Sequence, residues 1–254
     1  MSGIKVRIFN PPSCLFRYAH FIYDCVMPEV LAKTYTHGTV YREKSFLQTI
    51  GTFSKLYEDI MQVKNVELLE DDFNKLYLPT VRLEALHYHI LTREKIDIFR
   101  QYIFNRYSID ETKRDQKYPK ILLIERGEHV TLIEDPEIEV TVPHLLKNGK
   151  EIREIKNFDT VESYLQEKYT VDFKKIILEN MPFEEQVRHF VNAFVVVGCH
   201  GAGLINVMFS KEDTLVCEYL NPTLRFKTLC REMKLKHITI SNKDESLDEL
   251  KEYV

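Results

Sequence analysis

The second half of the sequence alternates short strand-like runs with segments whose apolar residues recur at helical spacing. The strand-like runs span Lys120–Glu125, Lys175–Glu179, Ala193–Val197, Thr214–Tyr219 and His237–Ile240. The segments of helical periodicity span Asp159–Lys168, Pro182–Asn192 and Thr223–Lys234. Short apolar strands that alternate with helices are typical of βαβ units on a parallel sheet buried on both faces. This half is therefore predicted to form an α/β domain.

The first half shows a weaker pattern of the same kind. Residues 16–35 carry apolar side chains at helical spacing and are predicted to form a helix that kinks or restarts near Pro28. Further elements are predicted as strands at residues 4–9, 65–70 and 74–80 and as helices over Arg42–Gln62 and Arg93–Arg106. We therefore expect a second α/β unit here.

A polar, charge-dense segment separates the two halves. Ser108–Lys120 has no large aliphatic residue except Ile109 and is predicted to be a linker. We expect two domains, residues 1–115 and residues 116–254, that face one another across a cleft; the length of 254 residues suits two small domains. Residues 127–152 interrupt the second domain and are predicted to be an insertion, a hairpin or a flap.

The composition is that of a globular protein and excludes several other classes. Hydrophobic residues make up 44% and charged residues 29%, unlike a disordered or collagen-like chain. The net charge of -4 argues against a nucleic-acid partner. The five cysteines are scattered without a C-x-x-C pair, as expected for free thiols in a reducing compartment. The first residues lack the apolar core of a signal peptide, and no apolar stretch approaches the roughly 20 residues of a membrane span, so we expect a cytoplasmic protein.

The strongest local signal is the run FVVVGCHGAGLINVMF at residues 194–209. An apolar strand ends there at Gly198, and Gly201 and Gly203 precede a helix-compatible run. Glycines let the backbone turn tightly and approach a ligand closely, and the first N–H groups of the next helix attract anions. The glycines could also serve only the packing of a tight turn. A histidine between two glycines, His200, has little reason to be there for packing, so we interpret the run as a pyrophosphate site at the carboxyl end of a parallel sheet.

Four residues outside this run are further candidates. Arg126 follows a strand and could neutralise a phosphate, and Glu218 ends another strand and could accept from ribose hydroxyls. His20 and Asp24 lie four residues apart on a predicted helix, as a base and its orienting partner would. Each of the four could instead be an ordinary strand-end or surface-facing polar residue. No metal site is predicted, because the sequence has no D-x-D, no H-E-x-x-H and no Cys/His pairing at zinc spacing.

Residues 181–220 combine a helix that carries a glutamine, an apolar strand, the block G-x-H-G-A-G-L-x-N-x-x-F and a strand that ends in glutamate. The residues that form this pattern are Gln186, Gly198, His200, Gly201, Ala202, Gly203, Leu204, Asn206, Phe209 and Glu218. The pattern resembles the C-terminal signature of glycosyltransferase family 61.

Other parts of the chain add to this resemblance. His20, Asp24 and Pro28 match the His, Asp and Pro of the family's N-terminal helix, and Arg126 matches the Arg that follows the first strand of its second domain. The family's R-x-I-x-N pattern is matched by Arg153, Ile155 and Asn157, later in the chain than is usual because of the insertion.

The resemblance implies a GT-B-like fold of two Rossmann-like domains and an inverting glycosyltransferase that uses a nucleotide sugar, usually a UDP-sugar. Since D-x-D is missing, no metal cofactor is expected, and helix N–H groups with Arg126 would stabilise the leaving diphosphate. Asp24 is the predicted base for the acceptor hydroxyl, with His20 as the alternative. Donor-binding residues are expected to be Arg126, Arg153, Asn157, Gln186, His200, Gly201, Ala202, Gly203, Asn206 and Glu218. Xylose is the favoured sugar, and the acceptor is expected to be a glycan or glycoprotein.

Two other functions remain open from the sequence. A sugar-nucleotide epimerase on the same fold would keep the cleft and the donor site, and a catalytically inactive module would keep only nucleotide-sugar binding. One fold hosts many functions, so product analysis is needed to separate them.

Overall fold

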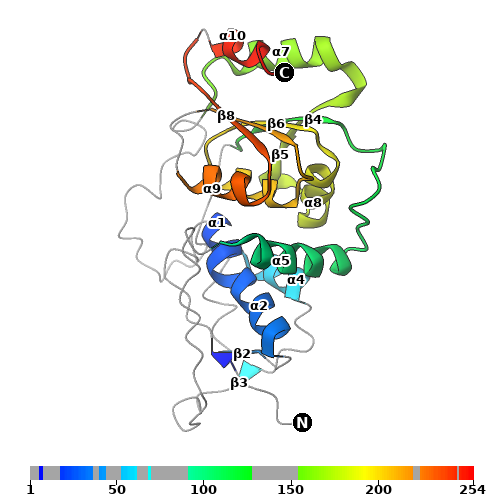
Figure 1. Ribbon diagram of the computed structural model, residues 1–254, viewed down its shortest axis with the longest axis vertical. Helices are drawn as coiled ribbons and strands as arrows, with labels where there is room; N and C mark the ends of the chain where they lie inside the picture. Colours follow the sequence, from blue (N-terminus) through cyan, green and yellow to red (C-terminus); the bar gives the residue numbers. More distant parts are fainter. Residues whose placement is uncertain are drawn as a thin grey trace. The chain divides into compact units, whose positions relative to one another are not determined.

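The computed structural model of the protein describes residues 6–7, 18–36, 40–43, 53–61, 68–69, 91–127, 154–219, 224–244 and 246–254. These residues fall into two compact units, one that ends at Arg106 and one that begins at Tyr107. Both units contain parallel strands and helices, so the predicted α/β class is confirmed (Figure 1). None of the described helices is long and apolar enough to cross a bilayer.

The first unit contains a long helix that changes its winding just before Pro28. Tyr18–His20 form α1, Phe21–Val26 are π-helical, and Met27–Thr36 form α2. The ring of a proline clashes with the carbonyl group four residues earlier and has no N–H to offer, so a wider π turn before it accommodates the proline without ending the helix. The irregularity predicted near Pro28 is therefore a change of winding within a continuous helix.

The other described elements of the first unit are α4 (Ser54–Met61), α5 (Arg93–Arg106) and the strands β1 (Val6–Arg7), β2 (Val40–Glu43) and β3 (Leu68–Leu69). The three strands form a parallel sheet in the order β1-β2-β3. The helix predicted over Arg42–Gln62 is wrong at its start, because Arg42 and Glu43 belong to β2, where they pair with Leu68 and Leu69 of β3. The helix predicted over Arg93–Arg106 is confirmed. The strand predicted at residues 74–80 lies outside the described residues.

The second unit is built on a five-stranded parallel sheet in the order β5-β4-β6-β7-β8. The strands are β4 (Ile121–Glu125), β5 (Phe173–Ile177), β6 (Val195–Cys199), β7 (Leu215–Tyr219) and β8 (Lys236–Ile240). The helices are α7 (Phe158–Tyr169), α8 (Phe183–Asn192), α9 (Leu224–Glu232), α10 (Ser246–Lys251) and the 3-10 helices η8 (Thr170–Asp172), η9 (Leu178–Asn180) and η10 (Ala202–Phe209). All five predicted strands are present within one or two residues of the expected positions.

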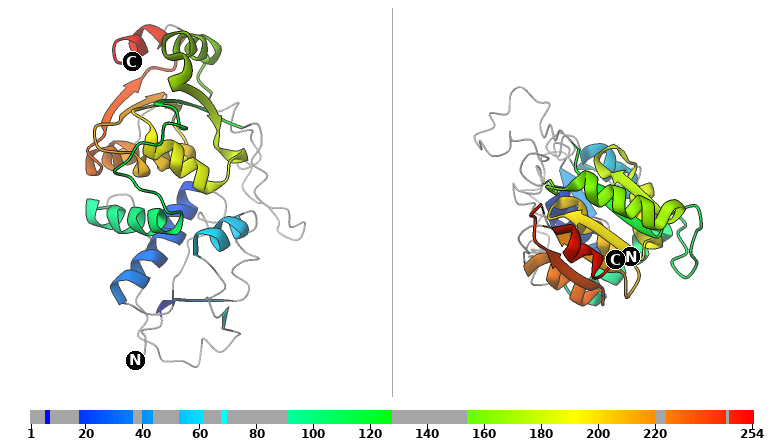
Figure 2. Two further views of the ribbon diagram at one scale, coloured as in Figure 1. Left: turned by 90° about the vertical axis from the view of Figure 1, so that its right-hand side faces the viewer. Right: turned by 90° about the horizontal axis from the view of Figure 1, so that it is seen from above.

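Helices cover both faces of this sheet. Figure 1 shows α7 and α10 on one side and α8 and α9 on the other, and the right-hand view of Figure 2 looks from the α7 side. Alternate residues of the strands, such as Leu123, Val197 and Cys217, form one buried core with Val161 and Leu165 of α7. Burial on both faces explains why the central strands β4, β6 and β7 are apolar at nearly every position, whereas the outer strands β5 and β8 carry exposed lysines.

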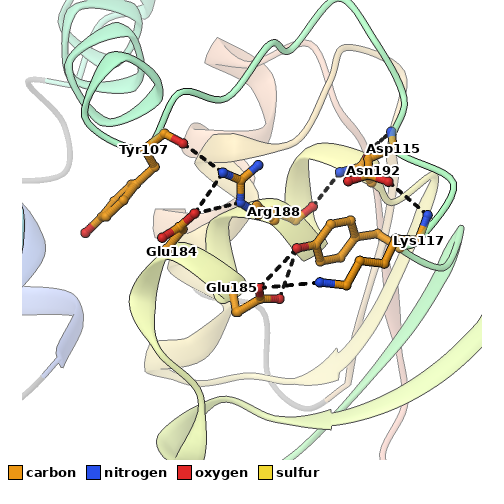
Figure 3. Close-up of polar contacts among 8 residues, drawn as sticks. Tyr107, Asp115, Lys117, Glu184, Glu185, Arg188 and Asn192 are labelled. Carbon is orange, nitrogen blue, oxygen red and sulfur yellow. Dashed lines mark hydrogen bonds and ion pairs between the residues drawn. The ribbon is translucent and has the colours of Figure 1, made fainter.

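The segment predicted as a linker is anchored to α8 in the second unit (Figure 3). The backbone N–H of Asp115 donates to Oδ1 of Asn192 at 2.7 Å, and the Tyr118 hydroxyl donates to the Glu185 carboxylate at 3.0 and 3.2 Å. Arg188 donates to the carbonyl oxygen of Tyr107 at 2.7 Å. The chain from Tyr107 onward is therefore held on the surface of the second unit.

Four cysteines lie in described parts of the chain, and all of them are buried thiols that form no disulfide. They are Cys25, Cys199, Cys217 and Cys230. Burial raises the pKa of Cys217 and of Cys230 to about 12, with the nearby Glu218 adding to the effect at Cys230. These two thiols therefore remain protonated and act as small apolar side chains, as the sequence suggested.

Candidate functional site

The strand order creates a switch point between β4 and β6. The chain passes from β4 to its neighbour β5 on one side, and then returns to form β6 on the other side of β4. In open α/β sheets, ligands bind outside the carboxyl ends of the strands at such a point. Arg126 follows β4 there, and His200 and Gly201 follow β6. Three residues singled out from the sequence thus come together because their strands are neighbours.

Arg126 and Gly201 lie against one another at this carboxyl end of the sheet. A methyl group added at Gly201 would overlap the Nη1 atom of Arg126 and would lie 3.3 Å from its Cζ atom. The Gly201 backbone is extended, with φ 173° and ψ 175°, a conformation that other residues also adopt. A side chain at this position is therefore disfavoured by the close approach of the guanidinium group rather than by backbone strain.

Helix η10 starts directly after Gly201. Its first N–H groups have no carbonyl partner within the helix, and their partial positive charge adds to the charge of Arg126. Ala202 and Gly203 form the start of this helix. A methyl group added at Gly203 would lie 2.7 Å from Cδ1 of Leu178, so the helix start also sits closely against the turn after β5.

Two buried side-chain amides hold η10 against α8. Asn206 is fully buried and donates through Nδ2 to Oε1 of Gln186 on α8 at 2.8 Å. Gln186 donates in turn to the carbonyl oxygens of Leu178 and Met181, both at 2.9 Å. Both residues were predicted to bind the donor. In the structure their amides contact one another and the backbone, and so they hold the helix that carries the site.

Glu218 lies at the centre of a second polar group. Its side chain is fully buried, and its two oxygens face Nδ1 of His200 at 2.5 Å and Nε2 of His237 at 2.7 Å. Burial alone would raise the pKa of Glu218, but hydrogen bonds and charge from the two histidines outweigh it and lower the pKa. The carboxylate is thus ionised and its oxygens are occupied, so the predicted contact with ribose hydroxyls would require it to exchange a partner.

The sequence pattern does not identify His237 as a site residue. It lies in β8, where Thr239 pairs with Glu218, so that residue 237 is one pleat away on the same face of the sheet. The sequence offers little signal for it, because the short strand also contains the polar residues Lys236 and Thr239. Its partner could not be recognised without the register between β7 and β8.

Asn157 starts α7 and is tied to the C-terminal segment. Its Nδ2 donates to the carbonyl oxygen of Asp244 at 3.2 Å, and its Oδ1 accepts from the Ser246 hydroxyl at 3.1 Å. The predicted donor-binding residue Arg153 lies outside the described residues. Asn157 therefore joins two parts of the second unit, and its proposed contact with the donor stays a prediction.

A small pocket opens at the same carboxyl end of the sheet, on the side of α7. The residues that line it come from the ends of β4 and β6 and from the segment that leads into α7: Ile124, Glu125, Arg126, Cys199, Glu154, Ile155 and Phe158. Arg126 thus borders both the pocket and the turn at Gly201. Two carboxylates also line this pocket, so a ligand there would meet acidic and apolar side chains as well as the guanidinium group of Arg126.

The two candidates for the base lie in the first unit. His20 is the last residue of α1, and Asp24 lies in the π-helical segment that follows. The structure does not describe their side chains, so the choice between them stays a prediction. Within the described ranges, no group of three or more His, Cys, Asp or Glu side chains could hold a metal ion.

The family model described as Glycosyltransferase 61 matches residues 18–217. The chain belongs to glycosyltransferase family 61. The match includes the helix with His20 and Asp24 as well as the switch-point residues Arg126 and His200. Family membership makes this chain a glycosyltransferase that takes a sugar donor and an acceptor. No curated protein matched the sequence.

Proposed function

We propose that this family 61 member transfers a sugar, with xylose favoured, from a UDP-sugar to a hydroxyl group of a glycan or glycoprotein, with inversion and without a metal. The proposal rests above all on the switch point, where Arg126, His200 and the start of η10 lie together at the carboxyl end of the sheet. These groups suit a diphosphate, because a guanidinium group and helix N–H groups bind phosphate oxygens well. The proposal includes that this chain adopts the two-domain GT-B architecture of the family.

The proposed reaction needs two kinds of help from the protein. The acceptor oxygen forms a bond to C1 of the sugar while the bond from C1 to the diphosphate oxygen breaks, through an oxocarbenium-like state. A base takes the acceptor proton, and we assign this role to Asp24 with His20 as the alternative. The diphosphate leaves with the bonding electron pair, and Arg126 with the η10 N–H groups would stabilise its charge in place of a metal.

The donor site is tested by ligand-induced stabilisation in the presence of EDTA. UDP, GDP, CMP and several UDP-sugars are compared, and a ligand at a hundredfold its Kd adds roughly 2.7 kcal/mol of stability. We expect stabilisation by UDP and by UDP-xylose, and we expect Arg126→Ala to reduce it strongly. No stabilisation by any nucleotide would refute the donor site, and stabilisation only after a divalent cation is added would refute metal independence.

Product analysis then tests the reaction. Incubation with UDP-xylose and a panel of glycans should release UDP and form a glycoside whose anomeric configuration, read by NMR, is opposite to that of the donor. An altered nucleotide sugar without transfer would indicate an epimerase. Binding without any reaction would indicate an inactive module.

A further inference from the structure

His237 is joined to the proposed donor site through one buried carboxylate. The two oxygens of Glu218 face different imidazoles, His200 on one side and His237 on the other. The side chains of Glu218 and His237 are 0% and 9% exposed, while that of His200 is 18% exposed. The group therefore runs from the outermost strand, β8, through Glu218 on β7 to His200 at the carboxyl end of β6.

The protons in this group can be assigned from its chemistry. The pKa of Glu218 is lowered because the two histidines outweigh the effect of its burial, so the carboxylate is ionised. An ionised carboxylate only accepts hydrogen bonds. Both ring nitrogens that face it must therefore carry hydrogen, which means Nδ1–H in His200 and Nε2–H in His237.

Further contacts fix the ring of His200 in place. Its backbone N–H donates to the carbonyl oxygen of Tyr219 at 2.7 Å. The ring of Phe226 meets the imidazole edge-on, with ring centres 5.2 Å apart. With Nδ1 held by Glu218, the Nε2 atom is the ring nitrogen left to meet a ligand. When Nε2 is protonated, the imidazolium can donate to a diphosphate oxygen while Glu218 compensates its charge.

We propose that His237 is a positioning residue: by holding the Glu218 carboxylate, it keeps His200 oriented with Nε2 available to the donor diphosphate. This inference rests on the proposed function. A hydrogen-bonded group behind a ligand-contacting histidine commonly fixes both the tautomer and the orientation of its ring. Without the N–H of His237, one Glu218 oxygen would lose its partner in a buried place, and the carboxylate would turn away or take up a proton.

Two substitutions separate hydrogen bonding from packing. His237→Gln keeps an N–H donor that can reach Glu218, whereas His237→Phe keeps a ring but has no donor. Thr239→Val is the matched control, because Thr239 lies on the same strand and face, opposite Glu218. For each variant, we would measure the UDP dissociation constant by calorimetry, the melting temperature, and the His200 tautomer by long-range ¹H–¹⁵N NMR without ligand.

We expect His237→Phe to weaken UDP binding roughly tenfold and to shift His200 toward a mixture of tautomers. His237→Gln should restore most of the affinity and the Nδ1–H tautomer, and Thr239→Val should resemble the wild type in both. Undiminished UDP binding by a folded His237→Phe protein would overturn the inference. Equal loss in the Gln and Phe variants would also overturn it.

The NMR measurement separates this inference from the proposed donor. If wild-type protein binds no UDP, the proposed function fails, while the His200 tautomer still reports on the role of His237. If His237→Phe does not fold, the wild type and His237→Gln decide the matter. An Nε2–H tautomer of neutral His200 in either of them would contradict the proposed arrangement.

Discussion

Gly201→Ala should damage the donor site while leaving the fold intact. The added methyl group overlaps Nη1 of Arg126, which is the far end of a flexible side chain, so the guanidinium group moves rather than the backbone. The extended backbone at residue 201 suits alanine, and we expect the free energy of unfolding to change by no more than about 1 kcal/mol. Moving the cation should cost one charge-assisted hydrogen bond to the diphosphate, about 1.5–3 kcal/mol.

A loss of that size corresponds to a UDP dissociation constant about 10- to 150-fold larger, measured by calorimetry. Gly127→Ala is the matched control. It adds the same methyl group at the residue that follows Arg126 in the sequence, but this group lies against the Glu179 side chain, 3.3 Å from its Cδ atom. Because Gly201→Ala acts through Arg126, the double variant with Arg126→Ala should bind UDP no more weakly than Arg126→Ala alone. Unchanged affinity in Gly201→Ala, or full additivity in the double variant, would refute the reasoning.

Three further predictions concern stability. Gly203→Ala should lower the free energy of unfolding by about 1–3 kcal/mol in urea titrations, because the methyl group would crowd the buried Leu178 at 2.7 Å. Asn206→Ala should cost about 1–3 kcal/mol in the same assay, because Oε1 of Gln186 loses its buried donor; an unchanged midpoint would contradict this. Burial, with a smaller effect of nearby lysines, lowers the pKa of His189 to about 4, below the 6.5 of an unfolded chain. The unfolded chain therefore takes up a proton first as the pH falls, and stability should drop by on the order of 3 kcal/mol between pH 7 and pH 4. In His189→Phe this pH dependence should be smaller, and equal slopes would argue against the prediction.

The sequence predicts the second unit better than the first, for a physical reason. The central strands β4, β6 and β7 are covered on both faces, so each appears as a nearly continuous apolar run such as Ile121–Glu125. Val40–Glu43 is short and ends in two charged residues, and its strand character depends on pairing with β1 and β3. A pattern within one segment cannot reveal a partner that lies far along the chain.

The same distinction applies to the site. The proximity of Arg126 and His200 could be expected, since the carboxyl ends of parallel strands meet at one edge of the sheet. The contact between Gln186 and Asn206 depends on the packing of α8 under η10, and the contact of His237 with its carboxylate depends on strand register. Motif positions indicate which residues gather at a site, but they do not tell which of them support the others.

The outermost strands of the second sheet also determine how copies of this chain can meet. An uncovered strand edge is a template onto which another strand can pair and start aggregation, and charged side chains counteract this. Lys174 and Lys175 lie on β5 and Lys236 begins β8, so lysine ammonium groups flank both edges. A foreign strand would have to remove water from these charges in order to pair. Pairing of a foreign strand beyond the five described strands is thereby disfavoured at both ends, which counteracts edge-to-edge association of a protein with such apolar central strands.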